Sequence, residues 1–188
     1  MSVIKAFARF PKEAEIIGRL LAGFADIEIA LMHCVQVVRD GDLDTVLKAM
    51  FRTVGESSRI QVADAFGRHH YTALGLETEF SMAISAVKYS WRIRSQYAHC
   101  LWYDDNTGQL AFTNLEEIAK ENAFLKDLRS LTIMHVDVPF LHDQELFFNY
   151  TEYLLVWVNF EGRTRSGELK QNPTQKPKSL RQPELHLP

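Results

Sequence analysis

Apolar side chains recur every three or four residues over most of the chain, a spacing that is typical of amphipathic α-helices. Breaks in this pattern, such as the expected C-cap glycine Gly41, divide it into separate segments. Pro11 suits the first turn of the first segment, and Ser57 or Ser58 suits the cap of the third. The pattern predicts five main helices, over residues 11–40, 42–52, 57–74, 77–99 and 138–160.

Between the last two helices the pattern changes to short runs that are typical of strands. Cys100–Tyr103 and Gln109–Thr113 flank a polar loop with a late glycine, which predicts a β-hairpin. Asn114 and Glu117 have the spacing of a capping box that opens a short helix. Residues 131–136 have the composition of a third strand.

The periodicity stops after Gly162, where prolines, glutamines and alternating charge become frequent. The sequence therefore predicts a mainly α fold, with a small β-hairpin inserted after the fourth helix. Its expected organisation is a helical domain over residues 1–162 and a polar C-terminal tail over residues 163–188.

Charge and cysteine content narrow the possible functions. The net charge is −3, and because residues 161–188 carry six basic and three acidic side chains, the rest of the chain is acidic. An acidic body argues against broad electrostatic binding to nucleic acid, so any such binding would need a local basic cleft. Cys34 and Cys100 have no CxxC spacing, so we expect neither a disulfide framework nor a zinc site. With no expected signal or membrane-spanning run, the predicted location is the cytoplasm, with no membrane partner.

A cluster of two arginines and a histidine lies where the fourth helix meets the predicted hairpin. Projected at about 100° per residue, Arg94 continues the apolar stripe, whereas Arg92 and His99 share one flank, with Ser95 between them. Arg94 and His99 are about 140° apart around an ideal helix. They converge only if the helix end is distorted, if the long Arg94 side chain wraps around it, or if two protomers contribute residues to one site.

The segment Arg94-Ser95-Gln96-Tyr97-Ala98-His99 resembles the motif of HEPN domains, an arginine followed by four residues and a histidine at the end of a long helix. These domains are helical bundles, often dimeric, and many are metal-independent endoribonucleases of toxin–antitoxin and phage-defence systems. The resemblance implies catalytic roles for Arg94 and His99, no cofactor, and a homodimer with RNA as substrate. It also implies an antitoxin or regulatory protein as a further partner. In such families an asparagine often stands where this chain has Ser95.

The chemistry of RNA cleavage suits these residue types. A base must take the proton of the ribose 2′-OH, an acid must protonate the leaving 5′-oxygen, and a cation must stabilise the charge on the phosphate. Histidine titrates near neutrality and arginine holds phosphate bidentately, so His99 is the expected acid or base and Arg94 the phosphate stabiliser. Arg92 and Ser95 are expected to contact substrate. Trp102 and Tyr103 are candidates for stacking on bases, with the alternative that one of them, as a strand residue, belongs to the core.

Other interpretations of the same residues stay open. Arg94 and His99 could simply tie the helix end to the hairpin, since a histidine in a last helical turn interacts well with the helix dipole. The fold could then serve as a non-catalytic module that regulates or sequesters a partner. His135, Asp137 and His142 are a weaker metal candidate, because their spacing matches no zinc pattern.

We also expect a dimer, because the two long apolar helices have more apolar surface than a small bundle can bury.

Overall fold

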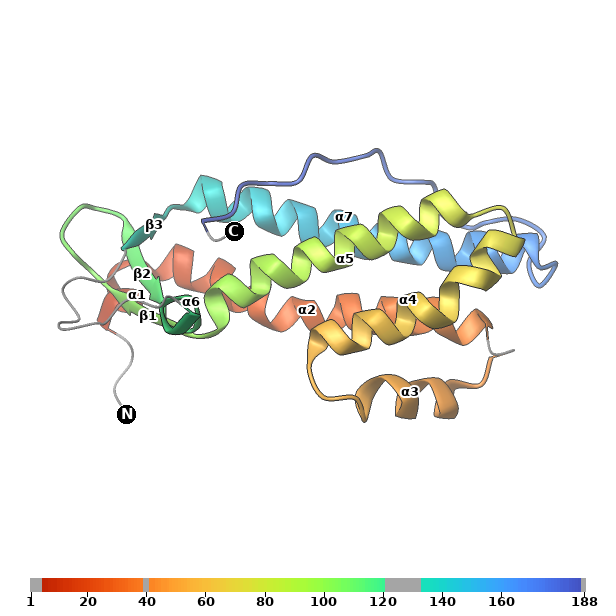
Figure 1. The fold of residues 1–188 in the computed structure, drawn as a ribbon. Coiled ribbons are helices and arrows are strands. Elements are labelled where there is room, and N and C mark those ends of the chain that lie inside the picture. The colour runs from red at the N-terminus through yellow and green to blue at the C-terminus, as the bar shows by residue number, and fades with distance from the viewer. Residues whose placement is uncertain (1–4, 39–40, 121–132, 187–188) are drawn as a thin grey trace. The chain divides into compact units, whose positions relative to one another are not determined.

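The computed structural model describes residues 5–38, 41–120 and 133–186, and the statements below concern these residues. They form seven helices and three strands, so the mainly α class is confirmed (Figure 1). In chain order the elements are α1 (Lys5–Arg9), α2 (Pro11–Val38), α3 (Leu43–Phe51), α4 (Glu56–Ala73), α5 (Glu77–Ala98), β1 (Cys100–Tyr103), β2 (Leu110–Asn114), α6 (Leu115–Lys120), β3 (Met134–Val136) and α7 (Val138–Arg165).

The residues that cap the starts of the helices can be compared with those expected from the sequence. The Asp42 side chain caps α3 by accepting a hydrogen bond from the backbone N–H of Thr45 at 3.0 Å, and Asp137 caps α7 in the same way. The predicted cap of α4 at Ser57 or Ser58 is wrong. That helix begins at Glu56, after Gly55 with φ of 87°, a backbone conformation that a serine would rarely adopt.

Two further helical details differ from the sequence pattern. The short helix α1 was not predicted, because five residues are too few to show a period. Helix α7 continues beyond Phe160 to Arg165. Residue 162, the predicted end of the helical domain, therefore lies inside α7. The division into a domain and a tail stays a prediction.

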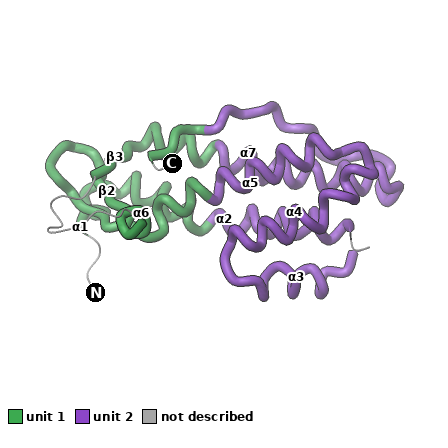
Figure 2. Tube along the Cα trace, viewed as in Figure 1, with its two compact units in different colours: residues 1–22, 92–146, 183–188 green, residues 23–91, 147–182 purple. Residues whose placement is uncertain are grey.

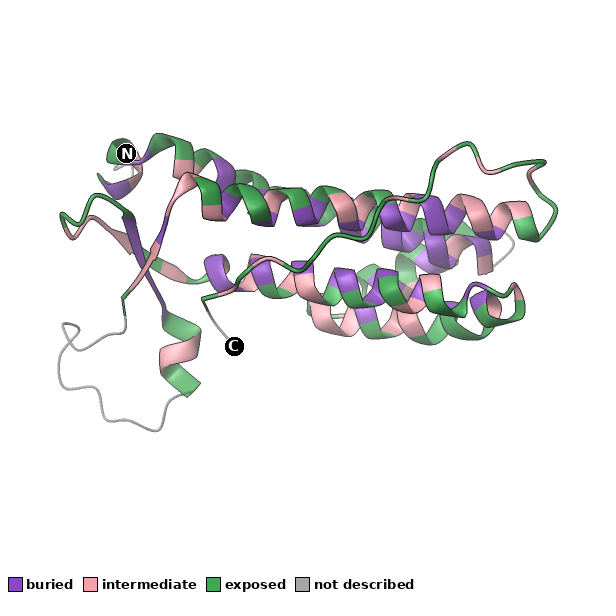
Figure 3. Ribbon diagram, turned by 90° about the horizontal axis from the view of Figure 1, so that it is seen from above, coloured by how far each residue is buried: buried purple, intermediate pink, exposed green. Residues whose placement is uncertain are grey.

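The predicted hairpin is part of a three-stranded antiparallel sheet with the order β1-β2-β3. Trp102 pairs with Phe112, and Phe112 pairs in turn with Met134. The central strand β2 is buried along its whole length (Figure 3). The third strand was predicted over residues 131–136, and the structure shows Met134–Val136, while residues 131 and 132 lie outside the described part of the chain.

The chain divides into two compact units (Figure 2). Unit 1 comprises residues 1–22, 92–146 and 183–188, and it contains the sheet and the end of α5. Unit 2 comprises residues 23–91 and 147–182, and it is built from helices and the segment that follows α7. The arginine–histidine cluster therefore lies entirely in unit 1.

The core of unit 2 is built around Tyr71. Its ring stacks on Phe80 with a centroid distance of 4.5 Å, and its hydroxyl donates to the backbone carbonyl of Cys34 at 3.0 Å. The Cys34 thiol donates to the carbonyl of Leu155 at 3.3 Å, and burial raises its pKa to about 12. These bonds satisfy the polar groups that burial removes from water.

Gly67 in α4 lies against the ring of Phe80, so we expect even a methyl group there to destabilise the protein. An added Cβ would press on Cζ of Phe80 and lie 2.9 Å from its Cε1, while the ring is held by Tyr71. Overpacking costs about 1–3 kcal/mol, against a gain in helix propensity of about 1 kcal/mol. Gly67→Ala should lower the free energy of unfolding by about 1 kcal/mol in urea denaturation.

Gly18 in α2 provides the matched control, because an added Cβ there meets no atom within 4 Å. Gly18→Ala should stabilise the protein by about 0.5–1 kcal/mol through helix propensity alone. A Gly67→Ala protein as stable as Gly18→Ala would contradict the predicted clash.

Helix α2 is long and apolar enough to cross a membrane by length and composition, which the sequence pattern did not lead us to expect. Half of its most apolar 18-residue window is buried inside the protein. Core helices and N-terminal signal sequences meet the same criterion, so the cytoplasmic location stays a prediction.

Residues 166–186 contain no helix or strand, yet part of this segment has specific contacts in unit 2. The ammonium group of Lys176 lies 3.0 Å from a carboxylate oxygen of Glu79 and 5.1 Å from the ring centroid of Trp157. The Asn172 side chain donates to the carbonyl of Trp157 at 3.2 Å. The segment therefore packs on α5 and α7 of this unit.

Candidate functional site

The last turns of α5 are anchored by a buried polar network in unit 1. The Tyr97 hydroxyl donates to Oε1 of Gln144 at 2.7 Å, and the Gln96 amide donates to the same oxygen at 3.3 Å. The Gln144 amide donates to the backbone carbonyl of Glu184 at 2.9 Å, and the backbone N–H of His186 donates to Oε1 of Gln96 at 3.3 Å. Because all three side chains are buried, these bonds fix the rotation of the helix end.

Asn114 joins the end of α5 to the start of α6. Its side-chain amide donates to the carbonyls of Ser95 and Gln96 at 3.3 and 3.1 Å. Its side-chain oxygen accepts from the backbone N–H groups of Glu116 and Glu117 at 2.9 and 3.1 Å, which confirms the predicted cap. One buried side chain thus sets the position of both helix ends that flank the candidate site.

His99 follows the last residue of α5 and is held by its backbone while its ring remains exposed. Its carbonyl accepts from the N–H of Leu115 at 3.0 Å. Its Nε2 lies 3.3 Å from Oε1 of Glu116, and both side chains are 57% exposed. An exposed pair of this kind contributes only about 0–1 kcal/mol to stability. The imidazole is therefore placed beside a carboxylate that can orient it, without being required for the fold.

The arginines lie on different flanks of the helix. Ile93, Gln96 and Tyr97 form its buried face, Arg92 is exposed, and Arg94 is half-buried. At about 100° per residue, Arg94 lies on one side of this face and Arg92 on the other, with His99. The apolar pattern predicts Arg94 on the buried stripe, whereas the structure leaves it at the edge, because the stripe has shifted to Ile93 and Tyr97.

The predicted stacking residues already have partners in the fold. The Trp102 ring is half-buried and lies 5.1–5.9 Å, between centroids, from the rings of Phe7, Tyr97 and Phe112. The Tyr103 hydroxyl is 2.9 Å from the Thr113 hydroxyl. Trp102 thus contributes to the core of unit 1, and base stacking by either residue stays a prediction.

Sequence reasoning missed the carboxylate that pairs with each of two histidines, His99 and the weaker metal candidate His135. Glu116 carries the carboxylate beside His99, and only its place in the first turn of the predicted short helix hinted at its location. His135 pairs with Asp105, with Nε2 to Oδ2 at 2.7 Å, which links β3 to the loop of the hairpin. Hydrogen bonds from Thr107 and then from His135 lower the Asp105 pKa to about 2. His135 is thus oriented towards the hairpin by a carboxylate that stays ionised at neutral pH.

Comparison with family models gave no match, and comparisons with curated proteins and with solved structures gave none either.

Proposed function

We propose that the chain is a dimeric, metal-independent endoribonuclease of the HEPN type, with His99 as general acid or base and Arg94 as phosphate stabiliser. The observation that carries the proposal is the exposed His99 imidazole at the end of α5, 3.3 Å from the Glu116 carboxylate. A histidine that only tied the helix to the hairpin would be expected to be buried and bonded away from solvent, so this exposure favours catalysis over the non-catalytic module.

Each residue has a defined part in the proposed reaction. The ribose 2′-oxygen attacks phosphorus as a base takes its proton, and the bond to the 5′-oxygen breaks as an acid protonates it. His99 takes the proton of the 2′-hydroxyl as the base and then delivers a proton to the leaving 5′-oxygen as the acid. Glu116, 3.3 Å away, holds the imidazole in position. Arg94 stabilises the phosphate charge, with Arg92 as a further phosphate contact.

The geometry of one helix supports the proposed dimer. Arg94 and His99 lie on opposite flanks of the buried face of α5, so one straight helix does not direct both to one phosphate. A second copy of the chain brings the two groups together if it packs at this end. Leu101 and Leu115, which are 46% and 48% exposed, lie close to His99 in the sequence and in the hairpin register. Their apolar surface is what the second copy is proposed to cover.

The proposal is tested by incubating the purified protein with RNA in excess EDTA. We expect cleavage to products with 5′-hydroxyl ends, which polynucleotide kinase labels directly, and a dimer by light scattering at micromolar concentration. RNA that stays intact at high protein concentration would reject the endoribonuclease. Cleavage that EDTA abolishes would reject metal independence, and an active monomer would reject the shared site.

A further inference from the structure

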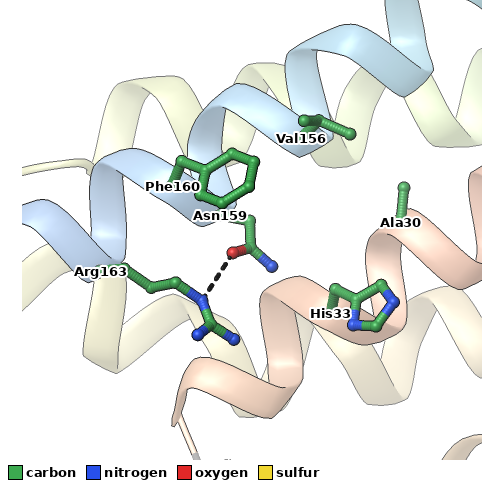
Figure 4. A pocket seen from close by; sticks show the side chains of 6 residues that line it. All are labelled: Ala30, His33, Val156, Asn159, Phe160 and Arg163. Carbon is green, nitrogen blue, oxygen red and sulfur yellow. Dashed lines mark hydrogen bonds between the residues drawn. The ribbon is translucent and has the colours of Figure 1, made fainter. Parts of the chain in front are cut away.

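A pocket of about 270 Å³ lies in unit 2, between α2 and α7 (Figure 4). One face of each helix lines the pocket, with lining residues three or four positions apart on α2 and on α7. The apolar part consists of Ala30, Val156 and Phe160, and the polar part of His33, Asn159 and Arg163. Apolar walls with a few convergent polar groups are the usual composition of a small-molecule site.

The polar side of the pocket is rich in hydrogen-bond donors. Nε of Arg163 donates to Oδ1 of Asn159 at 3.0 Å, which holds the guanidinium beside the amide (Figure 4). Nη1 of Arg163 lies 3.2 Å from Glu168. Within the described residues, the contacts of these two side chains use Nε and Nη1 of Arg163 and Oδ1 of Asn159, which leaves Nη2 of Arg163 and Nδ2 of Asn159 for a ligand. Asn159 is only 7% exposed, yet its unpaired Nδ2 is not among the fully buried atoms, so a ligand oxygen in the pocket can reach it.

The charge at this site favours an anion. Arg163 carries the positive charge of an arginine. Its side chain is only 29% exposed, and Glu168, its acidic partner, is more exposed at 46%. The guanidinium charge also acts on the core. Burial raises the pKa of Tyr71 well above its usual value, and the positive charge of Arg163 opposes this rise. His33 adds an imidazole at the exposed side of the same pocket.

We propose that this pocket binds a small monocarboxylate with an apolar body, such as an aromatic acid. The carboxylate accepts hydrogen bonds from Arg163 and Asn159, and the apolar body packs against Val156 and Phe160. A phosphate dianion fits less well, since the pocket offers one arginine and mainly apolar walls. The volume lies just below the range of about 300–1,000 Å³ for drug-sized ligands, so a ligand of about ten non-hydrogen atoms is expected.

The test is a titration of the full chain with benzoate, followed by NMR of the labelled Ala30 and Val156 methyl groups. Saturable shifts of both methyl signals are expected. Benzamide, a neutral molecule of the same shape, should bind at least about tenfold more weakly, because it lacks the charge-assisted hydrogen bonds. Absence of saturable shifts at millimolar benzoate, or equal binding of benzamide, would overturn the proposal.

Variants separate the charge from the cavity. Arg163→Gln should weaken benzoate binding at least about tenfold, whereas Arg68→Gln, an exposed arginine of α4 in the same unit, should leave it unchanged. Val156→Phe keeps the charge but fills the pocket, and it should also block binding. Well-dispersed methyl spectra establish that each variant is folded. Wild-type benzoate affinity in folded Arg163→Gln or folded Val156→Phe would refute the site.

Discussion

Replacing His99 by alanine is expected to lower the rate of RNA cleavage by about 10²–10⁴-fold, the range that a positioned general acid or base contributes. The fold should be unaffected, because the pair with Glu116 is exposed and contributes about 0–1 kcal/mol at most. Single-turnover cleavage of an end-labelled RNA measures the rate, and urea denaturation measures the stability.

His142 is the matched control for this substitution. It is an exposed histidine on α7 within the same unit. His142→Ala therefore also removes an exposed imidazole, but it leaves the end of α5 unchanged. We expect His142→Ala to cleave RNA at the wild-type rate. Undiminished cleavage by His99→Ala would show that the catalytic histidine lies elsewhere.

Mixing two inactive variants tests whether the site is shared between protomers. In a heterodimer of Arg94→Ala and His99→Ala, one composite site keeps both an intact arginine and an intact histidine. With random exchange of subunits, half of the dimers are heterodimers, and each heterodimer has one intact site out of two. The mixture should therefore regain about a quarter of the wild-type activity. If both residues acted within one chain, the mixture would stay inactive.

Local signals explain why most of the fold was predictable. The 3.6-residue period predicts the bounds of four of the five long helices to within a few residues. The caps Asp137 and Asn114 are also predictable, because each accepts a hydrogen bond from an N–H group only two or three residues further along the chain. The start of α4 was misplaced because two serines offered good caps, whereas the chain turns at Gly55. The local sequence did not show that Gly55, with φ of 87°, would precede the first residue of the helix.

The candidate site was predictable only in part, because its support comes from distant residues. The motif from Arg94 to His99 is visible in the sequence, and the exposure of His99 agrees with its projected flank. Glu116 lies 3.3 Å from His99 only because the hairpin returns the chain to the end of α5. Gln144, the buried acceptor for Tyr97, is 47 positions further on and has no local pattern that reveals it. Interactions of this kind depend on tertiary packing, which periodicity does not encode.

Replacing Gln144 by leucine is expected to lower the free energy of unfolding by about 2–4 kcal/mol. The change keeps most of the side-chain volume but removes the acceptor of the buried Tyr97 hydroxyl and of the Gln96 amide. Each buried polar group left unpaired costs about 1–3 kcal/mol. The bond to the carbonyl of Glu184 is lost as well. A lower urea midpoint at an unchanged slope would measure the loss.

A double substitution shows whether the cost arises from unpaired polar groups rather than from shape. Adding Tyr97→Phe removes the hydroxyl that lost its acceptor, so the double variant should be less destabilised than the sum of the two single changes. Gln109→Leu, at an exposed position of the hairpin loop, should change stability by less than about 0.5 kcal/mol. Strict additivity, or a Gln144→Leu protein as stable as Gln109→Leu, would contradict this account. Because the network fixes the turn that precedes His99, Gln144→Leu should also slow RNA cleavage under conditions in which the variant is still folded.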